Sequence, residues 1–477
     1  MGAEMSRTAS FCLVIACWAA IYLPGLGSLE IKGEEGRRIL PAVTMLETGN
    51  YLVPQVGSEP YFRKPPLVNW LVAASFKLTG VSNEWTARLP SVLSVLLVAI
   101  AFLTVARAAL GPNGSLFAAL IWLANAGMIE KGRLIEIEAL YVALFGLAFI
   151  LWLSWWKQRR SSWLTWTVPW IFLGLGILAK GPVHLFFFYS VVVAVLLFDG
   201  ELRQLISIKH FTGLLIMLGI FAAWAIPYWR TMSSASVGQN WAVQLTGRFT
   251  GDDFKLGSWL MNIPRGLAYF LPWTLLLPLV RRTMWSSNAD RNLARGLCWG
   301  TALPFLVVNL LPGGLPRYSM PALVPACWLM AMMLSAPEVR WRTKIWSTTS
   351  RQRFVIGTAI VASLLLCVYA AAIVPVLQLR SKVKPIAQEI DRLVPNGETL
   401  YAVDPDYQPF LFYVQSHLIY VSRLDDVPLT ARYLLVQGER ERELVESQRW
   451  LPLRLQLMKP FTDYRNHKVI LARVGDQ

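Results

Sequence analysis

Charge and cysteine are both scarce in this sequence of 477 residues. Only 16% of the residues are Asp, Glu, Lys or Arg, whereas 55% are hydrophobic, which excludes a disordered chain and differs from the composition of soluble domains. Five cysteines are an odd, small number, which excludes a disulfide scaffold, and all five lie within apolar stretches, where a thiol behaves as a small hydrophobe. The composition therefore indicates a membrane protein.

Uncharged stretches of roughly 15 to 26 residues recur along the sequence, and this is the length that a bilayer core requires. We expect about eleven transmembrane helices, within a range of about 10 to 13, because two stretches are short and the segment around Lys180 is also compatible with a re-entrant or tilted pair. The expected spans are residues 8–25, 88–107, 114–130, 139–156, 162–179, 181–198, 211–229, 265–280, 296–312, 318–335 and 354–376.

The first stretch has an alternative interpretation as a cleaved signal peptide, because Arg7 precedes an apolar run. A lipoprotein cleavage site at Cys17 is a variant of that interpretation. The apolar run continues past Cys17 to Tyr22 without a small-residue exit, so we expect a retained helix.

Basic residues cluster in three short loops, which follow the fourth, eighth and tenth expected spans. Since such clusters are retained in the cytoplasm, one orientation satisfies all three, with the N-terminus inside and the C-terminus outside. Orientation in a bilayer is thus the first use of the net charge of +16, and we expect no nucleic-acid partner. The clusters contain Lys157, Arg159 and Arg160; Arg281 and Arg282; and Arg340, Arg342, Lys344, Arg351 and Arg353.

Two long polar segments lie outside the expected spans. Residues 26–87 form a first outer loop within a transmembrane domain of residues 1–376, and residues 377–477 form a polar tail. The tail combines a charged helical stretch at about 380–393 with several β-type runs, so we expect a small α/β domain on the outer face. The β-type runs are 399–403, 418–421, 433–436 and 469–472.

Polar groups collect at the outer ends of the expected helices, whereas the spans themselves hold almost no ionisable groups. This pattern argues against a proton-coupled transporter or ion pump, which usually carries ionisable groups at mid-membrane depth. We expect the polar segments to emerge on one face of the membrane. They are Glu34-Glu35, Lys64 with its two following prolines, 131–138, Lys180-Gly181-Pro182 and 313–318.

These residue types suit an anionic, lipid-linked substrate. Lysine and arginine hold a phosphate near the interface, and a carboxylate beside them acts as a general base toward an acceptor hydroxyl. Each basic residue taken alone is equally typical of a lipid headgroup anchor. Because Glu34 and Glu35 are adjacent, we expect at most one of them to contact substrate directly, and we expect His184 to be a packing residue at a helix end.

Short motifs follow one another in a fixed order over about residues 30–335. They are Glu34-Glu35-Gly36-Arg37, the segments 45–54 and 59–67, Ala87-Arg88-Leu89-Pro90-Ser91, Gly132-Arg133-Leu134, Lys180-Gly181-Pro182, Leu271-Pro272-Trp273 and Leu315-Pro316-Arg317-Tyr318. In this order they resemble the bacterial aminoarabinose lipid A transferase and protein mannosyltransferase-like group (dolichyl-phosphate-mannose-protein mannosyltransferases) of the GT-C superfamily of membrane glycosyltransferases.

The resemblance implies an all-α polytopic GT-C fold, a periplasmic active site, a polyprenyl-phosphate-linked sugar donor and inversion at the anomeric carbon. It implies that Glu34 is the general base, where the family has a catalytic Asp, and that Glu35 supports it. The donor phosphate or substrate contacts that it implies are Tyr61, Lys64, Lys180, Arg317 and Tyr318, with Glu138 at a second acidic position.

The sequence departs from the family pattern at three positions. Glu34 and Glu138 replace Asp, which adds one methylene to each side chain. Arg63 replaces the acid that commonly precedes the motif lysine. Because Arg cannot ligate a cation, this replacement argues against a metal site that depends on that acid. We expect no metal ligands and the sequence firmly implies no cofactor, while dependence on a divalent metal stays an open alternative. The sugar and the acceptor stay unassigned.

The sequence thus predicts a polyprenyl-phosphate-sugar-dependent hexosyl- or pentosyltransferase of a bacterial inner membrane. We expect it to modify a lipid or glycan acceptor of the cell envelope, such as lipid A, with the donor, the acceptor and membrane lipids as its partners. Two alternatives stay open: a non-catalytic transporter or flippase of lipid-linked sugars, and a protein O-glycosyltransferase of the same superfamily.

Overall fold

The computed structural model describes residues 5–56, 59–60, 64–232, 254–341, 344–404, 408–447, 454–462 and 467–475. The chain divides into two compact units. The first unit comprises Met1–Pro24, Arg63–Leu67 and Leu89–Ala370, and the second comprises Gly25–Phe62, Val68–Arg88 and Ala371–Gln477.

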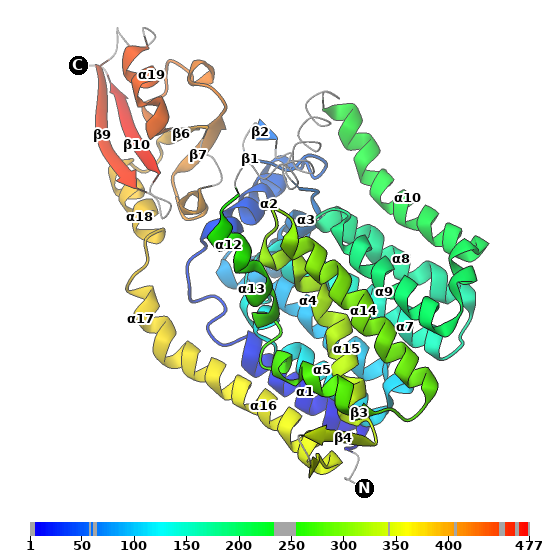
Figure 1. Ribbon diagram of the computed structural model, residues 1–477. Helices are drawn as coiled ribbons and strands as arrows, with labels where there is room; N and C mark the ends of the chain where they lie inside the picture. Colours follow the sequence, from blue (N-terminus) through cyan, green and yellow to red (C-terminus); the bar gives the residue numbers. More distant parts are fainter. Residues whose placement is uncertain are drawn as a thin grey trace. The chain divides into compact units, whose positions relative to one another are not determined.

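The first unit is a bundle of apolar helices (Figure 1). Each of the expected spans coincides with or overlaps a described helix, although α4 begins in the second unit and the last span extends into it. The main elements are α1 (Arg7–Tyr22), α4 (Glu84–Thr104), α5 (Arg107–Leu123), α6 (Ala126–Lys131), α7 (Ile137–Lys157), α8 (Ser162–Ala179), α9 (Val183–Asp199), α10 (Ile208–Thr231), α12 (Leu256–Leu260), α13 (Asn262–Ala268), the 3-10 helix η3 (Trp273–Arg282), α14 (Asn288–Leu310), the 3-10 helix η4 (Pro316–Ala322), α15 (Leu323–Ser335) and α16 (Thr348–Val368). The short helix α17 (Val374–Gln378), at the end of the last expected span, belongs to the second unit.

By length and composition, seven of the described helices can cross a membrane, or eight if the bent pair Leu256–Ala268 and Trp273–Arg282 forms one span. Helices α1 and α9 are apolar but shorter. The chain is therefore a mostly helical, multi-pass membrane protein. These seven or eight helices are fewer than the eleven or so spans that the sequence predicts, because several of the predicted spans correspond to shorter or broken helices.

Glycines set the close packing of α9 against α14. A Cβ atom at Gly296 would lie 2.7 Å from the Cα atom of Val195, and one at Gly300 would lie 2.5 Å from the Cα atom of Val191. Small residues four positions apart let two helix backbones approach in this way, as in many membrane helix pairs.

The three basic loops lie together at one end of the first unit. Lys157 Nζ, at the end of α7, lies 3.1 Å from Asp290 Oδ1 in α14. The strand β3 (Thr283–Met284), after η3, pairs antiparallel with β4 (Glu338–Trp341), after α15, and β4 pairs with β5 (Lys344–Ile345). This arrangement confirms that the basic clusters share one side. The first residues of α7 and of η4–α15 lie at the opposite ends of those helices.

The second unit contains a mixed sheet formed by the polar tail. Its strand order is β7-β6-β8-β10-β9, with β6 parallel to β7 and β8, and with β10 antiparallel to β8 and β9. Four strands and α18 confirm the β-type runs and the helical stretch that the sequence predicts, whereas β9 was not predicted. The elements are α18 (Lys384–Leu393), β6 (Thr399–Val403), β7 (His417–Val421), β8 (Tyr433–Gln437), α19 (Glu441–Glu446), β9 (Arg454–Thr462) and β10 (Lys468–Gly475).

The second unit also contains most of the segment expected as a first outer loop, whereas Arg63–Leu67 belongs to the first unit. That segment forms the 3-10 helix η1 (Gly33–Glu35), α2 (Gly36–Thr48), the short pair β1 (Gln55–Val56) and β2 (Glu59–Pro60), and α3 (Leu67–Thr79). The Glu30 carboxylate accepts hydrogen bonds of 2.9 to 3.1 Å from three backbone N–H groups at the start of α18. The Tyr413 hydroxyl donates to Glu84 at 3.0 Å and accepts from the Ile31 N–H. Loop and tail are thus held in one unit.

Candidate functional site

A buried ion cluster centres on Glu138 in the first turn of α7. Lys180 Nζ lies 3.0 Å from Glu138 Oε1, and Arg317 Nε lies 3.6 Å from the same oxygen. Lys180 is the residue at which α8 ends, and Gly181 turns the chain into α9 with a φ of 123° that favours glycine. Arg317 lies in η4. Three elements far apart in sequence therefore place two cations on one carboxylate.

Aromatic rings flank the ammonium group of this cluster. Lys180 Nζ lies 5.2 Å from the ring centre of Tyr141 and 5.0 Å from that of Tyr318, distances at which a cation is attracted to the ring faces. Tyr141 lies one turn after Glu138 on α7, so both side chains lie on the same face of that helix. The site joins buried charge to an aromatic surface, which suits a phosphate attached to an apolar chain.

His184 packs beneath the cluster. Its side chain is fully buried, with Nδ1 3.1 Å from the Tyr141 hydroxyl and Nε2 3.0 Å from the Leu173 carbonyl oxygen. Both ring nitrogens are therefore engaged within the protein. This confirms the prediction that His184 is a packing residue at a helix end.

A second ion cluster precedes α7. Lys131 Nζ lies 2.9 Å from Glu130 Oε1 and 3.1 Å from Glu136 Oε2. Burial lowers the pKa of Lys131, but Glu136 and Glu130 outweigh burial, so the pKa of the ammonium group lies above its ordinary value. Burial and the neighbouring Glu138 raise the pKa of Glu136, and Lys131 offsets only part of that effect. This cluster therefore holds the chain that leads into Glu138.

Arg133 has a structural role in this region. Its guanidinium donates hydrogen bonds to the carbonyl oxygens of Ile21 and Pro24 at the end of α1. Gly132 before it is required by close packing, because a Cβ atom there would lie 2.5 Å from the Met128 carbonyl oxygen. The Gly132-Arg133-Leu134 motif thus fixes the chain next to α1.

Glu35 is buried in the second unit and organises the first-loop segment. Its two carboxylate oxygens each lie 2.9 Å from a nitrogen of Arg88, and both side chains are almost fully buried. Arg88 also donates to the carbonyl oxygens of Leu26 and Leu29. A bidentate pair of this kind fixes both partners, so Glu35 holds the backbone next to Glu34.

Glu34 keeps access to solvent. Its side chain is 29% exposed, and the two carboxylate oxygens lie 2.8 and 3.1 Å from Arg37 Nη1 one turn later. Arg38 Nη2 lies 3.9 Å away. Of the two adjacent acids, Glu34 is thus the one whose carboxylate is open to solvent, whereas Glu35 is buried.

The lysine motif is described only in part. Tyr61 lies outside the described residues, as does Arg63. Lys64 is half-buried, belongs to the first unit, and precedes the buried Pro65 and Pro66 at the start of α3. The two prolines fix the backbone direction there.

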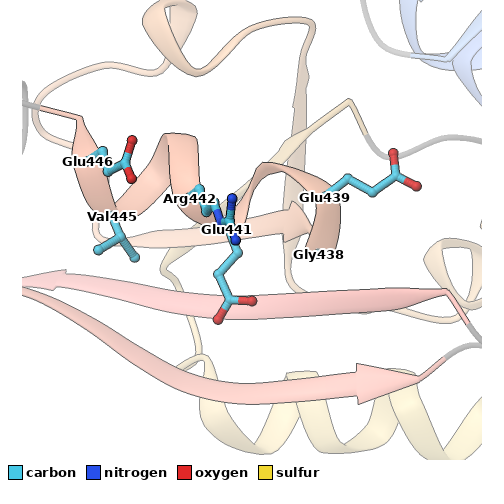
Figure 2. Close-up of a pocket in the computed structure, with 6 residues that line it drawn as sticks. All are labelled: Gly438, Glu439, Glu441, Arg442, Val445 and Glu446. Carbon is cyan, nitrogen blue, oxygen red and sulfur yellow. The ribbon is translucent and has the colours of Figure 1, made fainter.

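The described residues contain no group of three or more His, Cys, Asp or Glu side chains placed to hold a metal ion. A hollow beside α19 in the second unit carries several carboxylates, but those of Glu439, Glu441 and Glu446 point in different directions (Figure 2). None of the residues predicted from the sequence lines that hollow.

Comparisons with known proteins show what this chain is similar to. The model of the dolichyl-phosphate-mannose-protein mannosyltransferase family matches residues 63–228. An undecaprenyl phosphate-alpha-4-amino-4-deoxy-L-arabinose arabinosyl transferase of Pseudomonas fluorescens is 26% identical over 365 residues, covering 74% of this chain and 64% of that protein. The enzyme of that name from Pseudomonas savastanoi is 28% identical over 340 residues, covering 68% and 61%. The chain thus spans about three fifths of the length of these relatives.

Solved structures with a similar fold come from the same group of enzymes as these relatives. The crystal structure of ArnT from Cupriavidus metallidurans bound to undecaprenyl phosphate matches with a TM-score of 0.74, at 17% identity, over 99% of this chain and 100% of that one. The chain therefore shares the fold of that ArnT. The apo structure of the same ArnT matches the chain with a TM-score of 0.68 at 16% identity. These similarities agree with the resemblance that the motifs carry.

The structure brings together Glu138, Lys180, Arg317 and Tyr318, which the sequence singled out as separate segments. Glu34 and Glu35 belong to the other unit. The sequence analysis did not identify Tyr141, although its spacing of three residues from Glu138 on an expected helix was a usable signal.

Proposed function

We propose that the chain is a glycosyltransferase that takes its sugar from a polyprenyl-phosphate-linked donor. The single observation that carries the proposal is the pairing of Lys180 and the partly exposed Arg317 with the buried Glu138 carboxylate, flanked by Tyr141 and Tyr318. The names of the curated relatives and the undecaprenyl phosphate in the matching ArnT structure support the same class of donor.

Charge explains why this set suits the donor phosphate. The three groups at its centre carry two positive charges and one negative charge, so a singly charged phosphodiester balances them. As the sugar leaves, the phosphate gains negative charge, and fixed cations in a site that excludes water stabilise that charge. Lys180 and Arg317 are the groups that we assign to this task, with Lys64 and Tyr61 as further donor contacts. Glu138 holds the two cations in place.

We assign the proton transfer to Glu34. The acceptor hydroxyl oxygen attacks the anomeric carbon and forms the new C–O bond. The bond from that carbon to the phosphate oxygen breaks, and its electron pair leaves with polyprenyl phosphate. Glu34 takes the hydroxyl proton. Arg37, which contacts both oxygens of Glu34, and the buried Glu35–Arg88 pair beside it position the carboxylate.

We place this reaction at the periplasmic face of a bacterial inner membrane, and we assign the acceptor to the lipids or glycans of the envelope. The side of the first unit that carries the three basic loops would face the cytoplasm, because basic loops are retained there. Glu138 lies at the other end of α7 from Lys157, so the ion cluster would face the periplasm.

Mass spectrometry of envelope fractions tests this proposal in cells. Lipid A, envelope glycans and glycoproteins are compared between cells that contain the gene, cells that lack it, and cells that carry the Lys180→Gln variant. We expect one sugar to be missing from one lipid or glycan fraction in the cells that lack the gene and to be reduced in the cells that carry Lys180→Gln. Unchanged fractions under conditions where the protein is present in the membrane would argue against the proposal, and a sugar missing only from proteins would redirect it to a protein acceptor.

A further inference from the structure

A basic hollow of about 430 Å³ lies at the end of the first unit that carries the basic loops. The start of α14 forms one wall, and the chain from the end of η3 past β3 forms the other. The side chains that matter for its chemistry are Arg281, Trp285, Arg291, Arg295, Cys298 and Trp299. This hollow lies at the opposite end of α7 from the Glu138 cluster, roughly 30 Å away along that helix.

The spacing of residues on α14 concentrates positive charge in this hollow. Arg291, Arg295 and Trp299 follow one another at intervals of four residues, so their side chains lie on one face of the helix. Arg281 adds a third guanidinium from the opposite wall. Like charges one helical turn apart repel each other, so a bound anion would remove an unfavourable interaction.

The acidic residue nearest in sequence to these arginines, Asp290, pairs with other side chains. Asp290 lies 3.1 Å from Lys157 Nζ and accepts a hydrogen bond of 3.0 Å from Ser287 Oγ. Across the described parts of the chain, no carboxylate forms an ion pair with Arg281, Arg291 or Arg295. The protein thus gathers three guanidinium groups in one hollow and supplies no described counter-charge.

The two tryptophans show at which depth the hollow lies. Trp299 is 66% exposed on α14, and Trp285 lies just before the start of that helix. Tryptophan side chains are enriched at the level of the lipid headgroups, and arginine binds a phosphate through two parallel hydrogen bonds. Basic hollows between membrane helices on the cytoplasmic side are typical sites for anionic headgroups.

We infer that this hollow binds the phosphate headgroup of an anionic phospholipid in the leaflet that faces the basic loops. The ligand is a resident membrane lipid, whose acyl chains would lie against the exposed apolar face of α14. Arg291 and Arg295 hold the phosphate from one wall and Arg281 from the other. The site is separate from the one that we assign to the donor, and it does not depend on the proposed glycosyl transfer.

Cys298 supplies a reporter, because it lines the hollow. The full-length protein is placed in vesicles of phosphatidylcholine, with or without phosphatidylglycerol, and the alkylation rate of each cysteine is followed by peptide mass spectrometry. We expect phosphatidylglycerol to slow the alkylation of Cys298 by about tenfold and to leave Cys367 unchanged. Cys367 is exposed on α16 and does not line the hollow. Equal rates for Cys298 in the two kinds of vesicle would overturn the inference.

Two variants and one added anion complete the test. Arg291→Gln/Arg295→Gln is expected to lose the protection of Cys298, whereas Arg282→Gln keeps it, because Arg282 is an exposed neighbour of Arg281 that does not line the hollow. Equal protection in both variants would contradict the inference.

Inorganic phosphate in phosphatidylcholine vesicles is expected to give no protection of Cys298. Protection equal to that by the lipid would overturn the inference and assign the hollow to free phosphate. The comparison of vesicles uses the wild-type protein alone, so it holds even if a variant fails to fold.

Discussion

Lys180 Nζ lies 3.0 Å from Glu138 Oε1, although 42 residues separate the two positions. Both side chains are buried, with 12% of the lysine and 7% of the glutamate exposed. The contact joins the end of α8 to the start of α7 and fixes an ammonium group between two tyrosine rings. Such a lysine is held in place before any ligand arrives, so we regard it as the preorganised part of the donor site.

The first prediction concerns this lysine. Lys180→Gln removes a charge-assisted contact to the donor phosphate, so we expect the donor KM to rise about tenfold to a hundredfold. Lys157→Gln is the matched control, because Lys157 also pairs with one carboxylate but lies at the other end of α7. Steady-state kinetics with a varied donor concentration measure the difference. Equal KM values in the two variants would show that Lys180 does not contact the donor.

Glu34→Gln is expected to abolish turnover without affecting the fold. The amide cannot accept the hydroxyl proton, and loss of a general base typically costs about a hundredfold to ten-thousandfold in kcat. Because Glu34 is partly exposed, we expect the melting temperature to stay close to that of the wild type. Turnover at the wild-type rate by this variant would remove Glu34 from the mechanism.

Glu35→Gln is expected to lower the stability of the protein, unlike Glu34→Gln, because Glu35 is buried with Arg88. Removing one partner of a buried ion pair leaves the other charge uncompensated, which typically costs roughly 3 to 5 kcal/mol. We therefore expect a large fall in melting temperature, measured on purified protein in detergent. A variant as stable as Glu34→Gln would contradict the structural role of Glu35.

The stability of the protein should depend on pH through Glu136. Its pKa is raised in the folded state, so the folded chain holds this proton more tightly than the unfolded chain. The stability gained is full below the ordinary glutamate pKa of about 4.3 and is lost as the pH rises through the folded-state value. Glu136→Gln should therefore show a smaller fall of melting temperature from about pH 4 to pH 7 than the wild type. Glu130→Gln is the control, because Glu130 contacts the same lysine but is 55% exposed. Parallel curves for the wild type and Glu136→Gln would contradict the role of burial.

Gly300 tests the packing of α9 on α14. Alanine at this position would place a Cβ atom against the backbone of α9, and overpacking of this kind typically costs about 1 to 3 kcal/mol. Gly357→Ala in α16 is the control, because no atom lies within 4 Å of a Cβ atom there, so alanine should be neutral or stabilising. Melting temperatures that fall equally in both variants would argue against this helix contact.

Much of the fold follows from the sequence because apolar length and β-type runs are local signals. The helices of the first unit and the strands β6, β7, β8 and β10 were predicted from such runs. Helices α2 and α3 were not, because each has only 13 residues and α2 contains Pro41. Strand β9 contains Pro460 and basic residues, which hid its β character.

The candidate site was predicted less completely, because contacts between distant segments are not local. Charge patterns predicted on which side Lys180 and Arg317 would emerge, but not that both would lie on one oxygen of Glu138. For Arg351 the prediction from the sequence was wrong, since it placed this residue in a basic loop. In the structure it is buried and donates to the carbonyl oxygens of Leu334 and Ala336 at the end of α15.

Stoichiometry of donor cleavage tests the central claim most directly. The purified protein is reconstituted in vesicles with an undecaprenyl-phosphate-linked sugar and with envelope lipid as acceptor. The amounts of glycosylated acceptor and released undecaprenyl phosphate are then measured by mass spectrometry. We predict that the two products form in equal amounts and that neither forms with Glu34→Gln. Intact donor that crosses the bilayer, with neither product formed, would contradict the account and identify a transporter instead.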